Sequence, residues 1–191
     1  MIDPIFSDLK VVIGEIKDFI NNELQNNKED VCLGFAIPGV VDFKNTLVKT
    51  ESSFKNIDID FKKYFSDIPA IKQIILLNDG KAALLGEKYY GNLSDVENGF
   101  VITIGTAIGG AALLNNKLLR GSHNFAGEYS KQFAYVTGDD KDDEISIYCG
   151  LLQACYRFAF AKNISPSTID KTKLIDAYIA NDTDAVKIIE E

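Results

Sequence analysis

Residues 74–91 read IILLNDGKAALLGEKYYG, and this stretch decides the fold class. Its first four residues are apolar, as expected of a buried strand. The strand leads directly into Asn78 and Asp79, and the segment KAALLGEKYYG that follows predicts a helix that ends at Gly91. A strand followed at once by a helix is the repeating unit of α/β folds with a largely parallel sheet, so we expect that architecture here.

Two more elements precede this unit. The run VCLGFAI, from Val31 to Ile37, is almost continuously apolar, which predicts a second strand covered on both faces, with Cys32 in the core. Before it, apolar residues recur at helical spacing from Ile5 to Leu24. They predict a helix that opens at Asp3 and Pro4.

The pattern changes after the polar segment at residues 92–99. FVITI predicts a strand, GTAIGG a glycine-rich turn, AALL a second strand, and the Asn-Asn pair that follows a tight turn into KLL. An acidic segment at residues 137–144 predicts a solvated loop, and helices are predicted from about Ile145 onward. We therefore expect two lobes, one at residues 1–95 and one at residues 96–191.

The composition is that of a globular protein without a nucleic-acid surface. Hydrophobic residues make up 46% of the 191 residues and charged residues 25%, enough for a core, and the formal net charge is −8. A nucleic-acid binder places Lys and Arg against phosphates, so we expect no nucleic-acid partner. No segment has the pattern of a signal peptide or a membrane span, and we expect a cytoplasmic protein without a membrane partner.

Cysteine and histidine are too few for a disulfide scaffold or a typical zinc site. There are three cysteines, an odd number without paired spacing, which favours a reducing compartment. With His123 as the single histidine, few zinc ligands remain, so we expect no zinc and regard His123 as an ordinary loop residue.

The Asn78-Asp79 pair is the first candidate for chemistry. Both residues follow a predicted parallel strand, and ligands bind at the carboxyl edge of such sheets. There the carboxylate of Asp79 could take a proton from a substrate hydroxyl that Asn78 orients. An N-cap role for Asp79 in the helix that follows would explain the same residue, and both interpretations stay open from these residues alone.

Two glycine-bearing loops are the other candidates. GTAIGG contains Gly105 and Thr106 directly after a strand, which suits backbone N–H groups that approach a phosphate, although a plain tight turn is the alternative. It lacks the helix of a dinucleotide fingerprint and the Gly-Lys-Ser/Thr of a Walker loop. In GSHNFAGEYSK, Glu128 could accept hydrogen bonds from sugar hydroxyls or be a solvated loop carboxylate.

Together, the segments GFAIPGVVD, LLNDGKAALLGEKYYG and ITIGTAIGGAALLNNKLLRGSHNFAGE resemble the ROK family of repressors, open reading frames and sugar kinases. The similarity runs in register from about Leu33 to Glu128, and the helical segment beyond it fits less closely. Each motif alone is weak, whereas their order and spacing are specific. The resemblance implies an α/β fold of the actin-like ATPase (ribonuclease H-like) class, with the sugar bound between two lobes.

The resemblance also implies roles for single residues. Asp79 would be the base that takes the proton from the sugar hydroxyl attacking the γ-phosphate of ATP. Asn78 and Glu128 would hold sugar hydroxyls, with Gly39 of the Pro-Gly turn lining the same cleft. Gly105–Thr106 would belong to a phosphate loop for the nucleotide. ATP and Mg²⁺ are therefore the expected cofactors, and the protein mainly positions substrates and stabilises charge.

Several positions depart from the family pattern. There is no Asp-x-Gly-Gly-Thr loop on a first strand and no adenine-binding Gly-Gly turn near the end, so we expect an internal part of the family domain, incomplete at both ends. Ala107 replaces the middle glycine of Gly-Thr-Gly, and Gly80 and Lys81 replace the usual Ala-Asn. Lys131 stands where many members have a zinc-binding His. A subgroup that resembles β-glucoside kinases also lacks that zinc site, and the tail after Glu128 is closest to this subgroup.

These features define the predicted function. In full-length form we expect ATP-dependent phosphorylation of a hexose or β-glucoside hydroxyl, with this chain inactive because it lacks the first phosphate loop. The alternative is a non-catalytic sugar sensor related to the family's repressors, although residues 3–27 predict one helix and no helix-turn-helix. A degenerate relative that binds neither ligand is a third possibility. The open edge of the VCLGFAI strand predicts association, with a homodimer as one solution.

Overall fold

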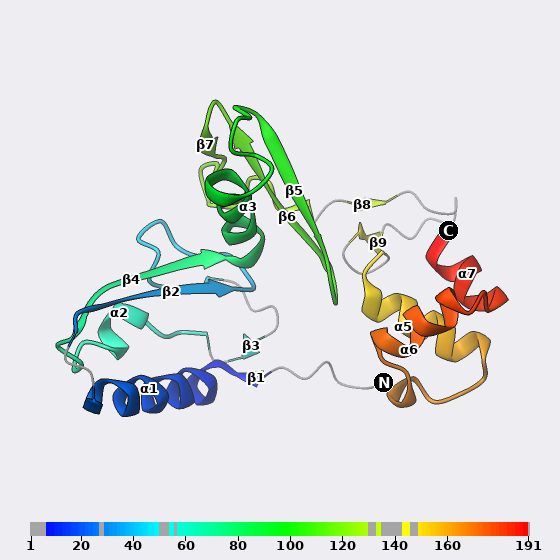
Figure 1. The fold of residues 1–191 in the computed structure, drawn as a ribbon, viewed down its shortest axis with the longest axis horizontal. Helices are drawn as coiled ribbons and strands as arrows, with labels where there is room; N and C mark the ends of the chain where they lie inside the picture. The colour runs from blue at the N-terminus through cyan, green and yellow to red at the C-terminus, as the bar shows by residue number, and fades with distance from the viewer. Residues whose placement is uncertain are drawn as a thin grey trace.

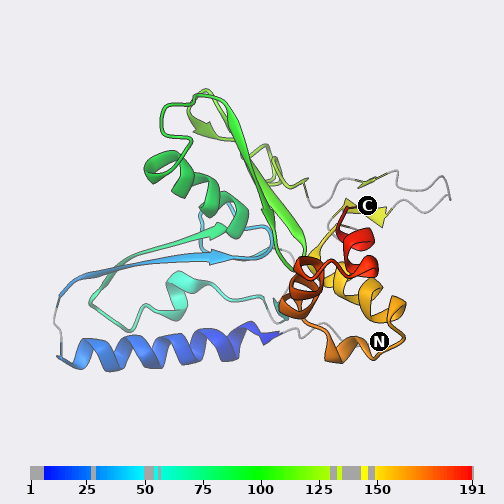
Figure 2. The ribbon, with the colours of Figure 1, turned by 45° about the vertical axis from the view of Figure 1, so that its right-hand side comes forward.

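The computed structural model describes residues 7–26, 29–49, 54–55, 57–129, 133–134, 143–145 and 149–190. Its helices are α1 (Leu9–Asn26), α2 (Phe61–Tyr64), α3 (Asp79–Tyr90), α5 (Leu151–Ala161), α6 (Lys171–Ile179) and α7 (Thr183–Glu190), with a 3₁₀ turn η2 (Pro166–Thr168). Its strands are β1 (Ser7–Asp8), β2 (Val31–Ile37), β3 (Phe54–Lys55), β4 (Ile71–Asn78), β5 (Gly99–Ile104), β6 (Ile108–Leu114), β7 (Lys117–Leu118), β8 (Phe133–Ala134) and β9 (Asp143–Glu144). Figures 1 and 2 show three groups: β2 and β4 with α1, the β5–β6 hairpin with α3, and the helices α5 to α7.

β2 and β4 form a parallel pair, as the sequence predicts. Phe35 lies opposite Leu76, and both face the side of the sheet on which α1 and α2 lie. The ring of Phe35 packs edge-on against Phe61 of α2, with centroids 5.0 Å apart. The buried residues of this core are Leu9, Ile13, Ile37, Val41, Val48, Phe61, Phe65, Ile68 and Leu76. Burial of this apolar area holds α1 and α2 against the sheet.

The second face of this sheet differs from the prediction. Burial alternates along β2, and Cys32, Gly34 and Ala36 are exposed in the part of the chain that the structure describes. The predictions of a strand covered on both faces and of Cys32 in the core are therefore wrong for this part. The run is continuously apolar because small residues stand at its alternate positions. Their exposure leaves little apolar area in contact with water, so that face does not need to be covered.

The first helix begins later than the sequence predicts. Ser7–Asp8 form the short strand β1, which pairs in parallel with β3, and α1 begins at Leu9. The Asp8 carboxylate accepts a hydrogen bond from Lys10 N at 2.8 Å, which is typical of a capping residue. The predicted start at residues 3 and 4 lies outside the described residues, and β1 separates it from α1.

β5, β6 and β7 form the predicted antiparallel sheet. Asn115 and Asn116 make the tight turn between β6 and β7, with φ angles of 49° and 60°. α3 packs on one face of this sheet, where Leu84 is buried with Ala111 and Leu113 of β6. α3 therefore connects the two sheets, since it follows β4 directly and packs on β6. The predicted division of the chain into two lobes stays a prediction.

The glycines of GTAIGG are divided between a turn and a strand. The turn comprises residues 105–107, whereas Gly109 and Gly110 belong to β6, so this strand begins earlier than predicted. A Cβ at Gly110 would lie 2.6 Å from Val101 O, and a Cβ at Gly80 would lie 2.8 Å from Gly110 O. The absence of a side chain at Gly80 lets the first turn of α3 lie against β6, and its absence at Gly110 leaves room for Val101 O and the ring of Tyr129.

The helices α5, α6 and α7 share a core of their own, formed by Ala154, Cys155, Phe158, Leu174 and Ala185. The predicted acidic loop is described only at Asp143–Glu144, which form β9 and pair with β8. None of the helices in the described ranges is long and apolar enough to cross a bilayer.

Candidate functional site

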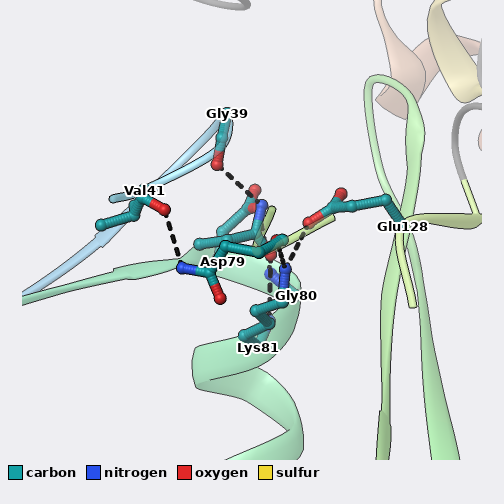
Figure 3. Close-up of polar contacts among 8 residues, drawn as sticks. Gly39, Val41, Asp79, Gly80, Lys81 and Glu128 are labelled. Atoms are coloured by element: carbon teal, nitrogen blue, oxygen red, sulfur yellow. Dashed lines mark hydrogen bonds and ion pairs between the residues drawn. The ribbon is translucent and has the colours of Figure 1, made fainter. Parts of the chain in front are cut away.

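Asn78 caps α3, and Asp79 does not. The side-chain oxygen of Asn78 accepts a hydrogen bond from Lys81 N at 3.0 Å, and its Nδ2 donates to Gly39 O at 3.2 Å (Figure 3). Asn78 is only 5% exposed, so it fixes the end of β4, the start of α3 and the Pro-Gly turn in one place. The alternative that made Asp79 the N-cap is therefore wrong.

Asp79 is the first residue of α3, and it is exposed. Its Oδ1 accepts a hydrogen bond from Gly80 N at 3.0 Å, which holds the carboxylate beside the end of the helix. The positive end of a helix dipole attracts negative charge, so an aspartate suits this first turn. Because capping does not need it, its carboxylate is available to accept a proton or a hydrogen bond from a bound molecule.

The Pro-Gly turn at Gly39 is followed by a second turn, over residues 42–47, which Asp42 holds. Gly39 has a φ of 99°, a left-handed conformation that favours glycine. The Asp42 carboxylate accepts hydrogen bonds from the backbone N atoms of Lys44, Thr46 and Leu47. Partial burial raises the pKa of Asp42, but these three hydrogen bonds outweigh it and hold the pKa below its ordinary value. The Asp42 carboxylate therefore stabilises the turn over residues 42–47 in its ionised form.

Glu128 approaches α3 from the segment that follows β7. Lys81 Nζ lies 3.0 Å from Glu128 Oε1 and donates a second hydrogen bond to Asn124 O at 2.6 Å. The side chain of Lys81 is 3% exposed and that of Glu128 is 10% exposed. Figure 3 shows Glu128 extending toward the first turn of α3, where Asp79 and Lys81 lie. The alternative of a solvated carboxylate is therefore wrong, because the side chain of Glu128 is only 10% exposed and is paired with Lys81.

The same segment is joined to the Pro-Gly turn. Asn124 is 4% exposed and donates from Nδ2 to Val41 O at 2.7 Å, and Arg120 donates to Asn45 Oδ1 at 3.2 Å. Asn124 Oδ1 is buried without a hydrogen-bond partner among the described residues. Three separate segments therefore meet at the first turn of α3, and we call them the α3 site: residues 39–45, 78–81 and 120–128.

Gly105 and Thr106 lie elsewhere, at the tip of the β5–β6 hairpin. Gly105 N donates to Ala107 O at 3.0 Å, and the carbonyls of Gly105 and Thr106 accept hydrogen bonds of 2.9 and 3.2 Å from the first two backbone N–H groups of α5. Thr106 and Ala107 are both exposed, and Thr106 is the one of the two with a polar side chain. It is four residues from Gly110, roughly 13 Å along a strand, so a ligand that contacts both sites must span that distance.

The structure thus brings four of the six predicted site residues together and leaves two apart. The four in the α3 site are Gly39, Asn78, Asp79 and Glu128. Sequence reasoning noted Lys81 as a departure from the family pattern and missed it as the partner of Glu128. A signal was present: Lys81 is the third residue of a helix, where the dipole disfavours a cation, so another partner is required.

The family is identified by comparison with known proteins. The model of the ROK family matches residues 8–191. This chain belongs to the ROK family. The β-glucoside kinase of Listeria monocytogenes serovar 1/2a is 30% identical to this ROK chain over 132 residues, which is 69% of the chain and 44% of that kinase. The xylose repressor of Bacillus subtilis strain 168 is 30% identical over 118 residues, 62% of the chain and 30% of the repressor.

A solved structure shows the same fold. The ROK glucokinase of Streptomyces griseus, in complex with glucose and AMPPNP, matches with a TM-score of 0.70 and 22% identity, over 92% of this chain and 62% of that one. The predicted α/β fold of the actin-like ATPase class is therefore confirmed. The ROK chain spans less than half the length of the two curated relatives described above.

The described residues of the α3 site offer few ligands for a metal ion. Mg²⁺ in phosphoryl-transfer sites takes one or two carboxylates in addition to phosphate oxygens. Asp79 offers an exposed carboxylate, whereas Glu128 is paired with Lys81. Within the described ranges, no group of three or more His, Cys, Asp or Glu side chains could hold a metal ion. Lys131, at the predicted place of a zinc-binding histidine, lies outside those ranges.

Proposed function

We propose that this ROK chain carries the sugar-binding core of a sugar kinase, which in full-length form transfers the γ-phosphate of ATP to a hexose or β-glucoside hydroxyl. The observation that carries the proposal is the pair of carboxylates in the α3 site. Asp79 is exposed at the start of α3, and Glu128 is held in place from the opposite segment. Family membership and the kinase relatives support the same function.

The residues of the α3 site would have distinct tasks. Asp79 would take the proton from the attacking sugar hydroxyl, because its carboxylate is exposed at the sheet edge where ligands bind in α/β folds. Glu128 would accept hydrogen bonds from sugar hydroxyls. One amide hydrogen of Asn78 is donated to Gly39 O, and the second would orient a sugar hydroxyl. At the hairpin tip, Gly105–Thr106 would meet a phosphate of the nucleotide.

ATP and Mg²⁺ are the proposed cofactors of the full-length kinase, without zinc. When bound, MgATP supplies the phosphoryl group and Mg²⁺ bridges its phosphate oxygens. We expect little or no catalysis from the 191-residue chain, because its sequence has no Asp-x-Gly-Gly-Thr phosphate loop. The cytoplasm is the proposed compartment, since it supplies ATP and keeps unpaired cysteines reduced.

A non-catalytic sugar sensor is the second candidate. The observation that favours it is the xylose repressor, which is as similar to this chain, at 30% identity, as the β-glucoside kinase is. In a sensor, Asp79 would only accept a hydrogen bond from the sugar, and the hairpin tip would have no nucleotide to bind. An additional response to MgATP would therefore favour the kinase, whereas its absence fits both candidates, because the chain has no Asp-x-Gly-Gly-Thr loop.

A thermal-shift panel tests the sugar site directly. The purified chain is melted with glucose, N-acetylglucosamine, N-acetylmannosamine, fructose or cellobiose, each with and without MgATP. A sugar at about a hundred times its Kd should add about 2.7 kcal/mol to the free energy of unfolding and raise the Tm by several degrees. The shift should disappear in Glu128→Ala, which removes the acceptor, and persist in Asp95→Ala, a control at an exposed aspartate outside the α3 site.

The Asp79→Asn variant distinguishes a base from a simple ligand. An amide oxygen still accepts a hydrogen bond but cannot take a proton, so the sugar-induced shift should persist in this variant. In a full-length protein with the same α3 site, phosphoryl transfer should be lost in the variant. Absence of any shift with all five sugars in the wild-type chain would contradict the proposed function.

A further inference from the structure

Lys81 is a buried cation in an unfavourable part of a helix. It is the third residue of α3, near the positive end of the helix dipole, and only 2% of it is exposed. An ammonium group leaves water at a high cost unless it is paired and hydrogen-bonded, and lysine is almost never fully buried without such partners. Helix formation alone therefore does not explain a lysine at this position.

The ammonium group of Lys81 binds the segment that carries Glu128. Its Nζ lies 3.0 Å from Glu128 Oε1 and donates to Asn124 O at 2.6 Å. Asn124 in turn donates from Nδ2 to Val41 O at 2.7 Å, next to the Pro-Gly turn. The first turn of α3 is thereby joined through one ammonium group to the loop that carries the predicted sugar ligand.

We propose that Lys81 is a positioning residue that orients the Glu128 carboxylate toward a sugar hydroxyl and so sets which hydroxyl pattern the site accepts. The proposal rests on the proposed function, because it requires a sugar at Glu128. A carboxylate discriminates between hydroxyl patterns only if its direction is fixed, and a buried, charge-assisted hydrogen bond fixes it. Lys81 acts through Glu128 and is not assigned a contact with the sugar.

The same helix contains a matched control. Lys88 donates hydrogen bonds to Ser94 O at 2.9 Å, Val96 O at 3.0 Å and Asn116 Oδ1 at 2.8 Å. It therefore ties α3 to neighbouring segments as Lys81 does, but with no carboxylate among these partners and at the other end of the helix. A purely structural role for a lysine of α3 should be shared by both residues.

The test compares hydroxyl recognition in the wild type, Lys81→Met and Lys88→Met. Calorimetric titration measures the Kd of each chain for glucose and for 2-, 3-, 4- and 6-deoxyglucose. In the wild type, removal of the hydroxyl that Glu128 holds should weaken binding about 10- to 100-fold, as expected for a hydrogen bond to a charged group. In Lys81→Met, glucose should bind about tenfold or more weakly, and that deoxy analogue should bind as well as glucose does.

Each outcome decides the proposal. Lys88→Met should discriminate between the hydroxyl patterns as the wild type does. If Lys81→Met does not fold, Lys81→Gln replaces it, because the Gln amide can still donate to Asn124 O but carries no charge. A Lys81 variant that binds glucose and still discriminates as the wild type does would show a structural role only and overturn the inference. A wild type that binds neither these probes nor any sugar of the thermal-shift panel would instead overturn the proposed function, and the inference with it.

Discussion

The α3 site and the hairpin tip are both glycine-bearing segments beside a strand, but they are held by different groups. In the α3 site, side chains connect the segments, since Asn78, Lys81 and Asn124 each bind a residue of another segment. At the hairpin tip, Gly105 and Thr106 are held by backbone hydrogen bonds, within the turn and to the start of α5.

This difference predicts how the two regions respond to change. A site built from side chains that bridge segments depends on each of them, because removal of one partner leaves a buried polar group unpaired. A loop held by backbone hydrogen bonds keeps its shape when a side chain is replaced. The sugar end of the site should therefore be sensitive to single substitutions, and the hairpin tip should tolerate them.

The largest effect on stability is expected for Lys81→Met. Lys81→Met removes the cation from the largely buried ion pair with Glu128, which should lower the free energy of unfolding by about 3–5 kcal/mol. Lys88→Met removes a more accessible lysine from the same helix and should cost about 1 kcal/mol. Urea denaturation measures both, and equal losses would show that the pair does not set the stability of the α3 site.

A smaller effect is expected for Gly80→Ala. The added Cβ would lie 2.8 Å from Gly110 O, so α3 must shift away from β6, at a cost of about 1–3 kcal/mol. Gly86 lies in the same helix, and a Cβ added there would meet nothing within 4 Å, so Gly86→Ala should instead stabilise by about 0.5–1 kcal/mol. Thermal melts of the two variants should therefore shift in opposite directions. A neutral Gly80→Ala would mean that the contact between α3 and β6 is not tight.

The Asp42 turn is expected to contribute a pH-dependent stabilisation of about 1 kcal/mol. The pKa of Asp42 is held below its ordinary value in the folded chain, so its contribution is complete above the unfolded pKa, about 3.9, and is lost as the pH falls through the lower folded value. Asp42→Asn should therefore be less stable than the wild type at pH 6 and approach it below about pH 3. Urea unfolding across this range measures the difference, and a difference that does not change with pH would contradict the assignment.

The smallest effect is expected at the hairpin tip. Thr106→Ala leaves the backbone hydrogen bonds to α5 in place and should change the free energy of unfolding by less than about 0.5 kcal/mol. The thermal shift with sugar should be unchanged, because Thr106 lies roughly 13 Å along the strand from the α3 site. A large loss of stability in this variant would show that side-chain contacts hold the tip as well, and the contrast between the two regions would fail.

Much of the fold follows from local patterns in the sequence. The apolar runs predicted β2 and the core of β4, and the Asn-Asn turn predicted the step from β6 to β7. The errors have physical causes. Small residues on one face of β2 were mistaken for buried ones. The glycines of β6 were assigned to a turn, but glycine also occurs within strands where another backbone approaches closely.

The α3 site was only partly predictable for a similar reason. Asn78 and Asp79 follow a strand in sequence, so their place at the sheet edge could be inferred. Which of the two residues caps α3 could not be inferred, because Asn and Asp are both good N-caps. Only the backbone geometry shows which side chain accepts the hydrogen bond from Lys81 N.

The sequence by itself determined the order of the elements, the α/β class and the ROK family, because these depend on local periodicity and on motif order along the chain. Only the tertiary structure decided that Lys81 pairs with Glu128 and that Asn124 binds Val41, since these partners lie 47 and 83 residues apart. A buried charge pairs with the groups that tertiary packing places beside it, and no local pattern in a single sequence specifies which groups those are.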